Sequence, residues 1–138
     1  MYRITVPFGC GHLGEVAVGR RSFELRAKCD LGERLCIDCD QEERRRAPLT
    51  GSPKQIAWAR KIRAGKMALF AARQPEWARA WRISGDDWAI VAVEAVRRQL
   101  SNQGSASWWI EHRYRDPWRL CVELDPRLEP LAESARPV

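Results

Sequence analysis

Apolar and polar residues alternate in the N-terminal segment of the chain. A two-residue period is typical of strands that bury one face. Residues 19–22, Gly-Arg-Arg-Ser, suit a turn between two such segments. The pattern therefore predicts a three-stranded antiparallel sheet. Its inward positions are Tyr2, Ile4 and Val6, then Val16 and Val18, then Phe23 and Leu25.

From residue 53 onward, apolar residues recur every three or four positions, which predicts helices. Ser52 suits the N-cap and Pro53 the first helical position, so we expect a helix over residues 53–73. Pro75 should end or interrupt this helix, with a short helical piece over residues 76–81. The expected apolar stripe consists of Trp58, Ile62 and Leu69, joined by Ala59 and Phe70.

Further helices and one strand are predicted towards the C-terminus. Asp86 and Asp87 place acidic residues at the start of a helix that runs to about Leu100, and a serine caps a short helix over residues 106–113. Residues 118–124 alternate loosely, which favours a strand with Cys121 in the core. The expected core of this region comprises Trp58, Ile62, Trp88, Val91 and one of Trp108 and Trp109.

Composition places the chain among globular proteins. Its 138 residues are 45% hydrophobic and 30% charged. No apolar run is longer than that of residues 88–93, which is far too short to cross a bilayer. The N-terminus has no apolar stretch of signal-peptide length. We therefore expect a cytoplasmic protein without a membrane partner.

The cysteines suggest a metal site. Five cysteines, an odd number in a chain without a secretion signal, argue against a disulfide framework. Cys10 and His12, together with Cys36 and Cys39, supply the four sulfur and nitrogen ligands of a structural zinc site. Cys29 is a rival to His12 as the fourth ligand. Redox chemistry at Cys36 and Cys39 is an alternative, but no thioredoxin-like strand-then-helix pattern precedes that pair.

These features predict an α+β fold in two modules. Residues 1–46 are expected to form a small antiparallel sheet like that of a zinc ribbon, because so small a sheet needs a metal to be stable. Residues 47–53 form a linker rich in turn-forming residues, and residues 54–124 form a helical module of three to four helices. Residues 125–138, with three prolines, are expected to be a poorly ordered tail.

The net charge of +6 comes mainly from residues 54–82, which hold eight basic residues and one acidic residue. Trp77 and Trp81 are interleaved with arginines in this stretch. Mixed basic and aromatic side chains are typical of surfaces that bind nucleic acid or protein, while a solvated helix face is the alternative. The candidate binding residues are Lys54, Arg60, Lys61, Arg63, Lys66, Trp77, Arg79, Trp81 and Arg82.

Several segments resemble small proteins of phages, plasmids and integrated mobile elements. These segments are Cys10-Gly11-His12 with Cys36-x-x-Cys39, the run from Leu49 to Arg63, and residues 106–113 with the motif Trp108-Trp109-Ile110-x-x-Arg113. Those proteins carry a zinc-ribbon head and a helical part, often with a further cysteine where this chain has Phe8. The resemblance implies a setting in mobile DNA rather than a particular activity.

No catalytic constellation and no Gly-rich phosphate loop is recognisable, so we expect neither enzymatic activity nor a small-molecule substrate. The preferred hypothesis is a zinc-binding interaction protein of a phage or mobile element that acts on nucleic acid or a nucleic-acid-bound complex. The alternative is an anti-defence inhibitor, for example an anti-CRISPR protein, that binds a host protein complex. Binding through phosphate contacts depends steeply on salt, which distinguishes the two hypotheses.

Overall fold

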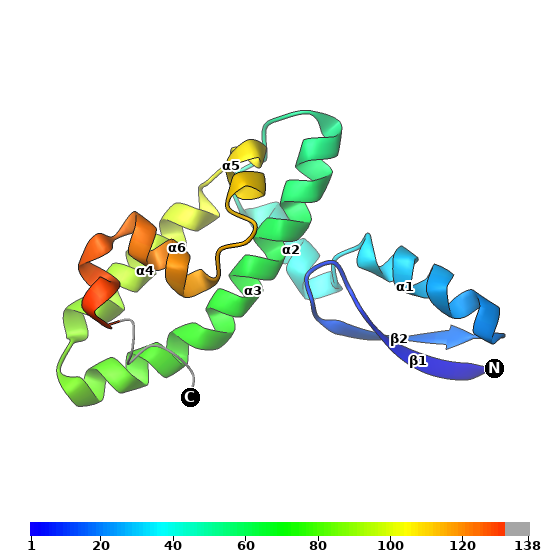
Figure 1. Ribbon diagram of the computed structural model, residues 1–138, viewed down its shortest axis with the longest axis horizontal. Coiled ribbons are helices and arrows are strands. Elements are labelled where there is room, and N and C mark those ends of the chain that lie inside the picture. Colours follow the sequence, from blue (N-terminus) through cyan, green and yellow to red (C-terminus); the bar gives the residue numbers. More distant parts are fainter. Residues whose placement is uncertain (132–138) are drawn as a thin grey trace.

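The computed structural model describes residues 1–131 and has the predicted α+β class (Figure 1). A hairpin with helix α1 lies on one side of the long helix α3, and α4, α5 and α6 lie on its other side. In chain order the elements are β1 (Tyr2–Pro7), β2 (Leu13–Val18), the 3-10 turn η1 (Arg21–Phe23), α1 (Glu24–Gly32), α2 (Ile37–Arg45), α3 (Pro53–Ser84), α4 (Asp87–Ser101), α5 (Ala106–Glu111), α6 (Pro117–Leu124) and the 3-10 segment η2 (Pro126–Leu131).

The N-terminal part, which we call the head, contains residues 1–46. β1 and β2 pair antiparallel with Ile4 opposite Val16, and α1 packs on both strands. The predicted third strand is wrong, because Phe23 ends η1 and Leu25 lies in α1. Residues 24–32 contain strong helix formers and no β-branched residue, so two alternating apolar positions were too few to define a strand.

Helix α3 begins as expected and ends later than expected. The Ser52 hydroxyl accepts a hydrogen bond from the Gln55 N–H (3.2 Å), and Gln55 Oε1 accepts one from the Ser52 N–H (3.0 Å). These bonds form a capping box. The helix continues through Pro75, contrary to prediction, and ends at Ser84, with Gly85 as the C-cap at a left-handed φ of 80°. Pro75 costs a hydrogen bond, but burial of Phe70 and Trp77 on either side holds the helix together.

The hydrophobic core lies between α3, α4, α5 and α6, and its composition corrects the prediction. Trp77 and Trp81, expected on the surface, are buried against Trp118, with ring centroids 5.3 Å and 6.0 Å away. Conversely, Trp58 and Trp88, expected in the core, are exposed. Val91 is exposed as well, whereas Ile62 is half-buried and Trp109 is fully buried, as expected for one of the adjacent pair.

The C-terminal elements also differ from the prediction. Residues 118–124 belong to helix α6, which has Asp116 as its N-cap and Pro117 as its first residue. The alternation read as a strand is one face of this short helix, which buries Leu120 and Cys121. Residues 126–131 of the expected tail form η2, because Leu128 is fully buried in the core. Residues 132–138 lie outside the described part of the chain.

The head meets α3 near Gly9 and Gly65. An added Cβ at Gly65 of α3 would lie 3.5 Å from the Cys10 carbonyl oxygen. At Gly9 it would lie 2.8 Å from the Gly32 carbonyl oxygen and 2.9 Å from the Lys61 side chain, so a larger residue would not fit. The loop between β1 and β2 therefore rests directly on the middle of α3. Within residues 1–131, no helix combines the length and apolar character needed to cross a bilayer.

Candidate metal centre and basic surface

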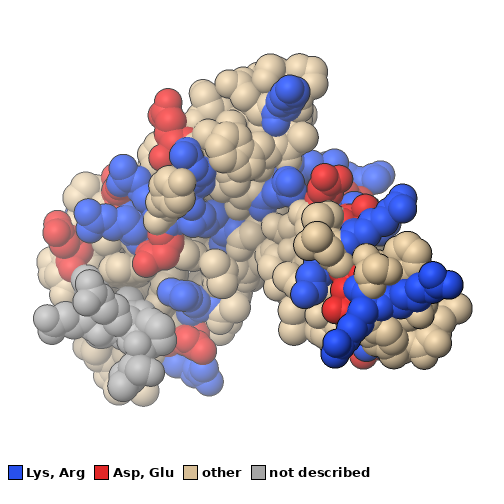
Figure 2. Space-filling model, turned by 45° about the vertical axis from the view of Figure 1, so that its right-hand side comes forward, with Lys and Arg blue, Asp and Glu red and all other residues tan. Residues whose placement is uncertain are grey.

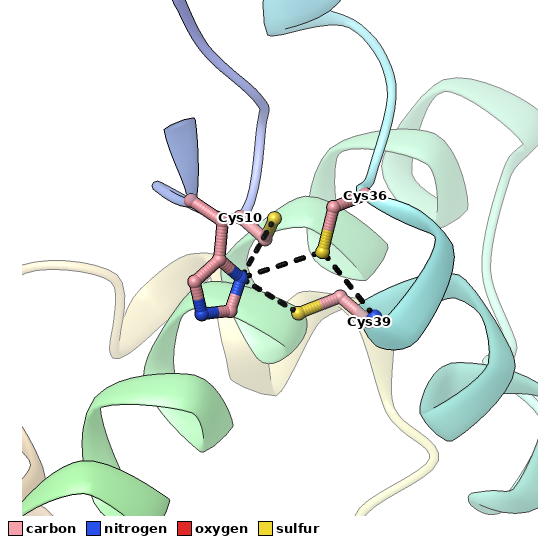
Figure 3. Close-up of side chains that lie close together, drawn as sticks. Cys10, Cys36 and Cys39 are labelled. Carbon is pink, nitrogen blue, oxygen red and sulfur yellow. Dashed lines mark hydrogen bonds between the residues drawn. The ribbon is translucent and has the colours of Figure 1, made fainter. Parts of the chain in front are cut away.

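Three thiols and one imidazole nitrogen converge near the contact between the head and α3 (Figure 3). The ligand atoms of Cys10, His12, Cys36 and Cys39 all lie within 4.8 Å of one another. His12 Nδ1 lies 3.5 Å, 3.4 Å and 3.3 Å from the sulfurs of the three cysteines in that order. One nitrogen cannot make three hydrogen bonds to sulfur. The arrangement is that of ligands around a common centre, and it could hold a metal ion.

The first half of the site is a tight turn between β1 and β2. Gly11 has a φ of 92°, in the left-handed region that glycine adopts without strain. The Gly11 N–H donates to the Phe8 carbonyl (2.9 Å), and the Phe8 N–H donates to the His12 carbonyl (2.8 Å). This turn directs the Cys10 and His12 side chains to the same point.

The second half of the site is the start of helix α2. Cys36 is the N-cap, and its sulfur lies 3.5 Å from the Cys39 nitrogen, whose N–H donates to it. The structure thus brings together all four residues predicted as ligands, and it does so beside a small antiparallel sheet. Cys29, the rival ligand, is exposed on α1 and lies outside the cluster.

The thiols of the cluster influence one another electrostatically. Burial raises the pKa of Cys10, but backbone donors at Cys36 and His12 outweigh this effect, and the pKa falls to about 7. Burial and the neighbouring sulfurs raise the pKa of Cys39 to about 12. A cation bound among the thiols would favour their deprotonated forms, because it replaces the repulsion between neighbouring thiolates by attraction.

Arg63, predicted to bind a partner, is instead buried inside the protein. Its guanidinium donates to both carboxylate oxygens of Glu43 in α2 at 2.9–3.0 Å. It also donates to the Ala47 carbonyl (2.8 Å) and the Gln103 carbonyl (3.2 Å). Exposed fractions are 2% for Arg63 and 5% for Glu43. Arg63 therefore joins α2, the linker, α3 and the loop after α4, and is removed from the candidate interface.

Other predicted interface residues also change position. Trp77 and Trp81 are core residues and cannot stack on an external partner. Arg60 forms an ion pair with Asp40 of α2, so its charge is partly compensated. Figure 2 shows basic side chains over both lobes of the molecule with acidic side chains among them. The predicted residues that remain accessible are Lys54, Arg79 and Arg82, which are exposed, and Lys61 and Lys66, which are half-buried.

The structure reveals an aromatic and cationic group that the sequence did not identify. The Arg113 guanidinium lies 4.4 Å from the ring centroid of Tyr114 and 5.2 Å from that of Trp58. Tyr114 is 85% exposed and Trp58 is 46% exposed. Trp58 is exposed because α3 turns the neighbouring residues Ala59 and Arg63 towards the interior. No local pattern indicates that Arg113, 55 positions later, lies beside it.

No protein-family model, curated protein or solved structure matches the chain in the comparisons made. The resemblance to proteins of mobile elements therefore stays a prediction.

Proposed function

We propose that Cys10, His12, Cys36 and Cys39 bind one structural zinc ion. Sulfur and imidazole nitrogen are the ligands that zinc prefers, and four protein ligands complete a tetrahedron without a place for substrate. Bonds of about 2.3 Å to sulfur and about 2.0 Å to nitrogen separate these ligand atoms by about 3.5 Å. The distances of 3.3–3.5 Å from His12 Nδ1 to the three sulfurs agree with that spacing. The role of such a site is to stabilise the head and its contact with α3.

Protein purified without added metal should contain about one zinc ion per chain, because structural sites hold zinc tightly. Cys36→Ser should lose most of this zinc, since only three ligands remain. Cys29→Ser is the matched control, because Cys29 lies outside the cluster. Elemental analysis of the three proteins gives the metal content. Equal zinc in wild type and Cys36→Ser would show that the cluster is not the site.

We further propose that the protein is a non-enzymatic interaction protein that binds nucleic acid or a nucleic-acid-bound complex. The observation that carries this proposal is a set of six cations distributed along α3. Within residues 1–131, none of them has a carboxylate oxygen within 4.0 Å. Cations without a partner attract phosphates. These residues are Lys54, Lys61, Lys66, Arg73, Arg79 and Arg82.

The setting of both histidines supports a non-enzymatic role. His12 belongs to the candidate metal site. His112 is half-buried and stacks on Trp108 with ring centroids 3.9 Å apart, and its Nδ1 lies 2.7 Å from the Trp108 carbonyl oxygen. An imidazole held in this way packs within the protein, as a structural side chain does.

Binding of a labelled oligonucleotide should weaken steeply with salt. Three to five phosphate contacts correspond to an affinity loss of about 20- to 100-fold between about 50 mM and about 200 mM salt. Fluorescence anisotropy titrations at several salt concentrations measure this slope. A protein that ignores both DNA and RNA at about 50 mM salt would contradict nucleic-acid binding, and an acidic protein partner would then be the better explanation.

A further inference from the structure

A groove runs between the metal-site loop and helix α3. One wall is the loop that carries Gly9, Gly11 and His12, and the other is α3. Arg113, which follows α5, closes one side. The groove has a volume of about 560 Å³, within the range of about 300–1,000 Å³ that ligand sites occupy. On the α3 side, the residues that line the groove include Lys61, Lys66 and Leu69.

The three cations of the groove lack ion-pair partners. In the described part of the chain, Lys61, Lys66 and Arg113 have no carboxylate oxygen within 4.0 Å. Burial lowers the pKa of Lys66, and the more distant charge of Asp116 only partly opposes this effect. A half-buried ammonium group without a close anion is costly. An anionic ligand in the groove would offset that cost.

Aromatic rings extend the groove on the Arg113 side. The Arg113 guanidinium, 5.2 Å from the Trp58 centroid and 4.4 Å from the Tyr114 centroid, links the two exposed rings to the cations of the groove. Leu69 adds an exposed apolar side chain on α3. Cations beside exposed planar groups are the combination that single-stranded nucleic acid requires, because phosphates and base faces follow one another along the strand.

We propose that this groove binds single-stranded nucleic acid. Phosphates lie against Lys61, Lys66 and Arg113, and unpaired bases stack on Trp58 and Tyr114. Bases in a duplex already stack on one another, so the exposed rings favour a single strand over a duplex. The inference rests on the proposed nucleic-acid function and narrows it to one site and one class of ligand.

The aromatic part of the proposal has a matched control. Trp58 is 46% exposed with Arg113 over its ring, and Trp88 is 43% exposed with Arg127 over its ring at 5.8 Å. Loss of a stacked base should make Trp58→Ala bind a labelled 12-nucleotide single strand roughly 5- to 100-fold more weakly. Tyr114→Ala should show a smaller loss in the same direction. Trp88→Ala should bind within about twofold of wild type.

The cationic part of the proposal is tested by salt dependence. Lys61→Ala and Lys66→Ala should each make the slope of log affinity against log salt shallower by about 0.7, the value for one phosphate contact of a single strand. Lys28→Ala in α1 and Arg119→Ala in α6 are the controls, because both side chains are exposed and neither residue lines the groove. Their slopes should equal that of wild type.

The outcomes separate the groove from the general function. If wild type binds with a steep salt dependence but the groove variants behave like their controls, the groove is wrong and the nucleic-acid function stands. Tighter binding of a 12-base-pair duplex than of the single strand would overturn the choice of ligand. If the wild-type protein binds neither the single strand nor the duplex, both the nucleic-acid function and the groove are excluded. Circular dichroism and the thermal midpoint of each variant establish that it is folded.

Discussion

Glu43→Ala is expected to destabilise the protein by about 3–5 kcal/mol, because it leaves the Arg63 guanidinium buried without its carboxylate. Three hydrogen bonds of 2.9–3.0 Å join the two side chains. Arg63 also binds the carbonyls of Ala47 and Gln103, so it cannot leave the interior without freeing these groups. The effect should extend to both lobes, since Arg63 joins the head to the helical part. Urea unfolding monitored by circular dichroism measures the change in free energy.

Glu42→Ala is the matched control for this prediction. Glu42 precedes Glu43 on α2 and pairs with Arg45, but both side chains of that pair are largely exposed. An exposed ion pair contributes at most about 1 kcal/mol. If Glu43→Ala and Glu42→Ala lost the same stability, the buried pair would not have the role described. Replacing Glu43 and Arg63 together by apolar residues should cost less than Glu43→Ala, because the buried Arg63 charge is then removed as well and only Arg46 loses its Glu43 partner.

Elements with local signals were predictable from the sequence. Ser52 and Pro53 marked the start of α3, and the acidic residues at 86 and 87 marked the start of α4 at Asp87. The spacing of Cys10, His12, Cys36 and Cys39 indicated a four-ligand cluster, which the structure assembles. Each of these signals lies in a few neighbouring residues and depends little on distant contacts.

The register of α3 was not predictable in the same way. The expected stripe of Trp58, Ile62 and Leu69, joined by Ala59 and Phe70, was right for Ala59 and Phe70, but Trp58 and Leu69 are exposed and Arg63 is buried. The buried face is turned by one position from Trp58 and Leu69, which is about 100° around a helix. Because Pro75 was expected to end or interrupt the helix, the continuation of the buried stripe to Trp77 and Trp81, at the same three- and four-residue spacing, was not predicted. An arginine inside the core, paired with a distant glutamate, gave no local sign of its burial.

The prediction of strands in two short segments was wrong for a different reason. Residues 23–25 and 118–124 are too short for a two-residue period to be told from one face of a helical turn. Their helical state depends on packing, since α1 covers the hairpin and α6 buries Cys121 in the core. The groove and the Trp58–Arg113 contact likewise depend on how distant segments come together. Sequence therefore indicated the metal ligands more clearly than the surface beside them.

The burial of the tryptophans gives the second large prediction. Trp81→Ala should cost about 3–5 kcal/mol, because it removes a ring that is 1% exposed from the centre of the core. The Trp77 and Trp118 rings, with centroids 6.2 Å and 6.0 Å away, would face the resulting cavity. For a protein of this size such a loss corresponds to a fall of at least about 10 °C in the thermal midpoint, which calorimetry measures.

Trp88→Ala removes the same side chain from the surface. Trp88 lies in the first turn of α4 and is 43% exposed, so water can fill much of the space and little cavity forms. Its cost should therefore stay below about 1.5 kcal/mol. The opposite ranking, with Trp88→Ala the more damaging change, would place Trp88 in the core and Trp81 at the surface, as predicted from the sequence. The difference between the two variants thus tests the register of the helical core directly.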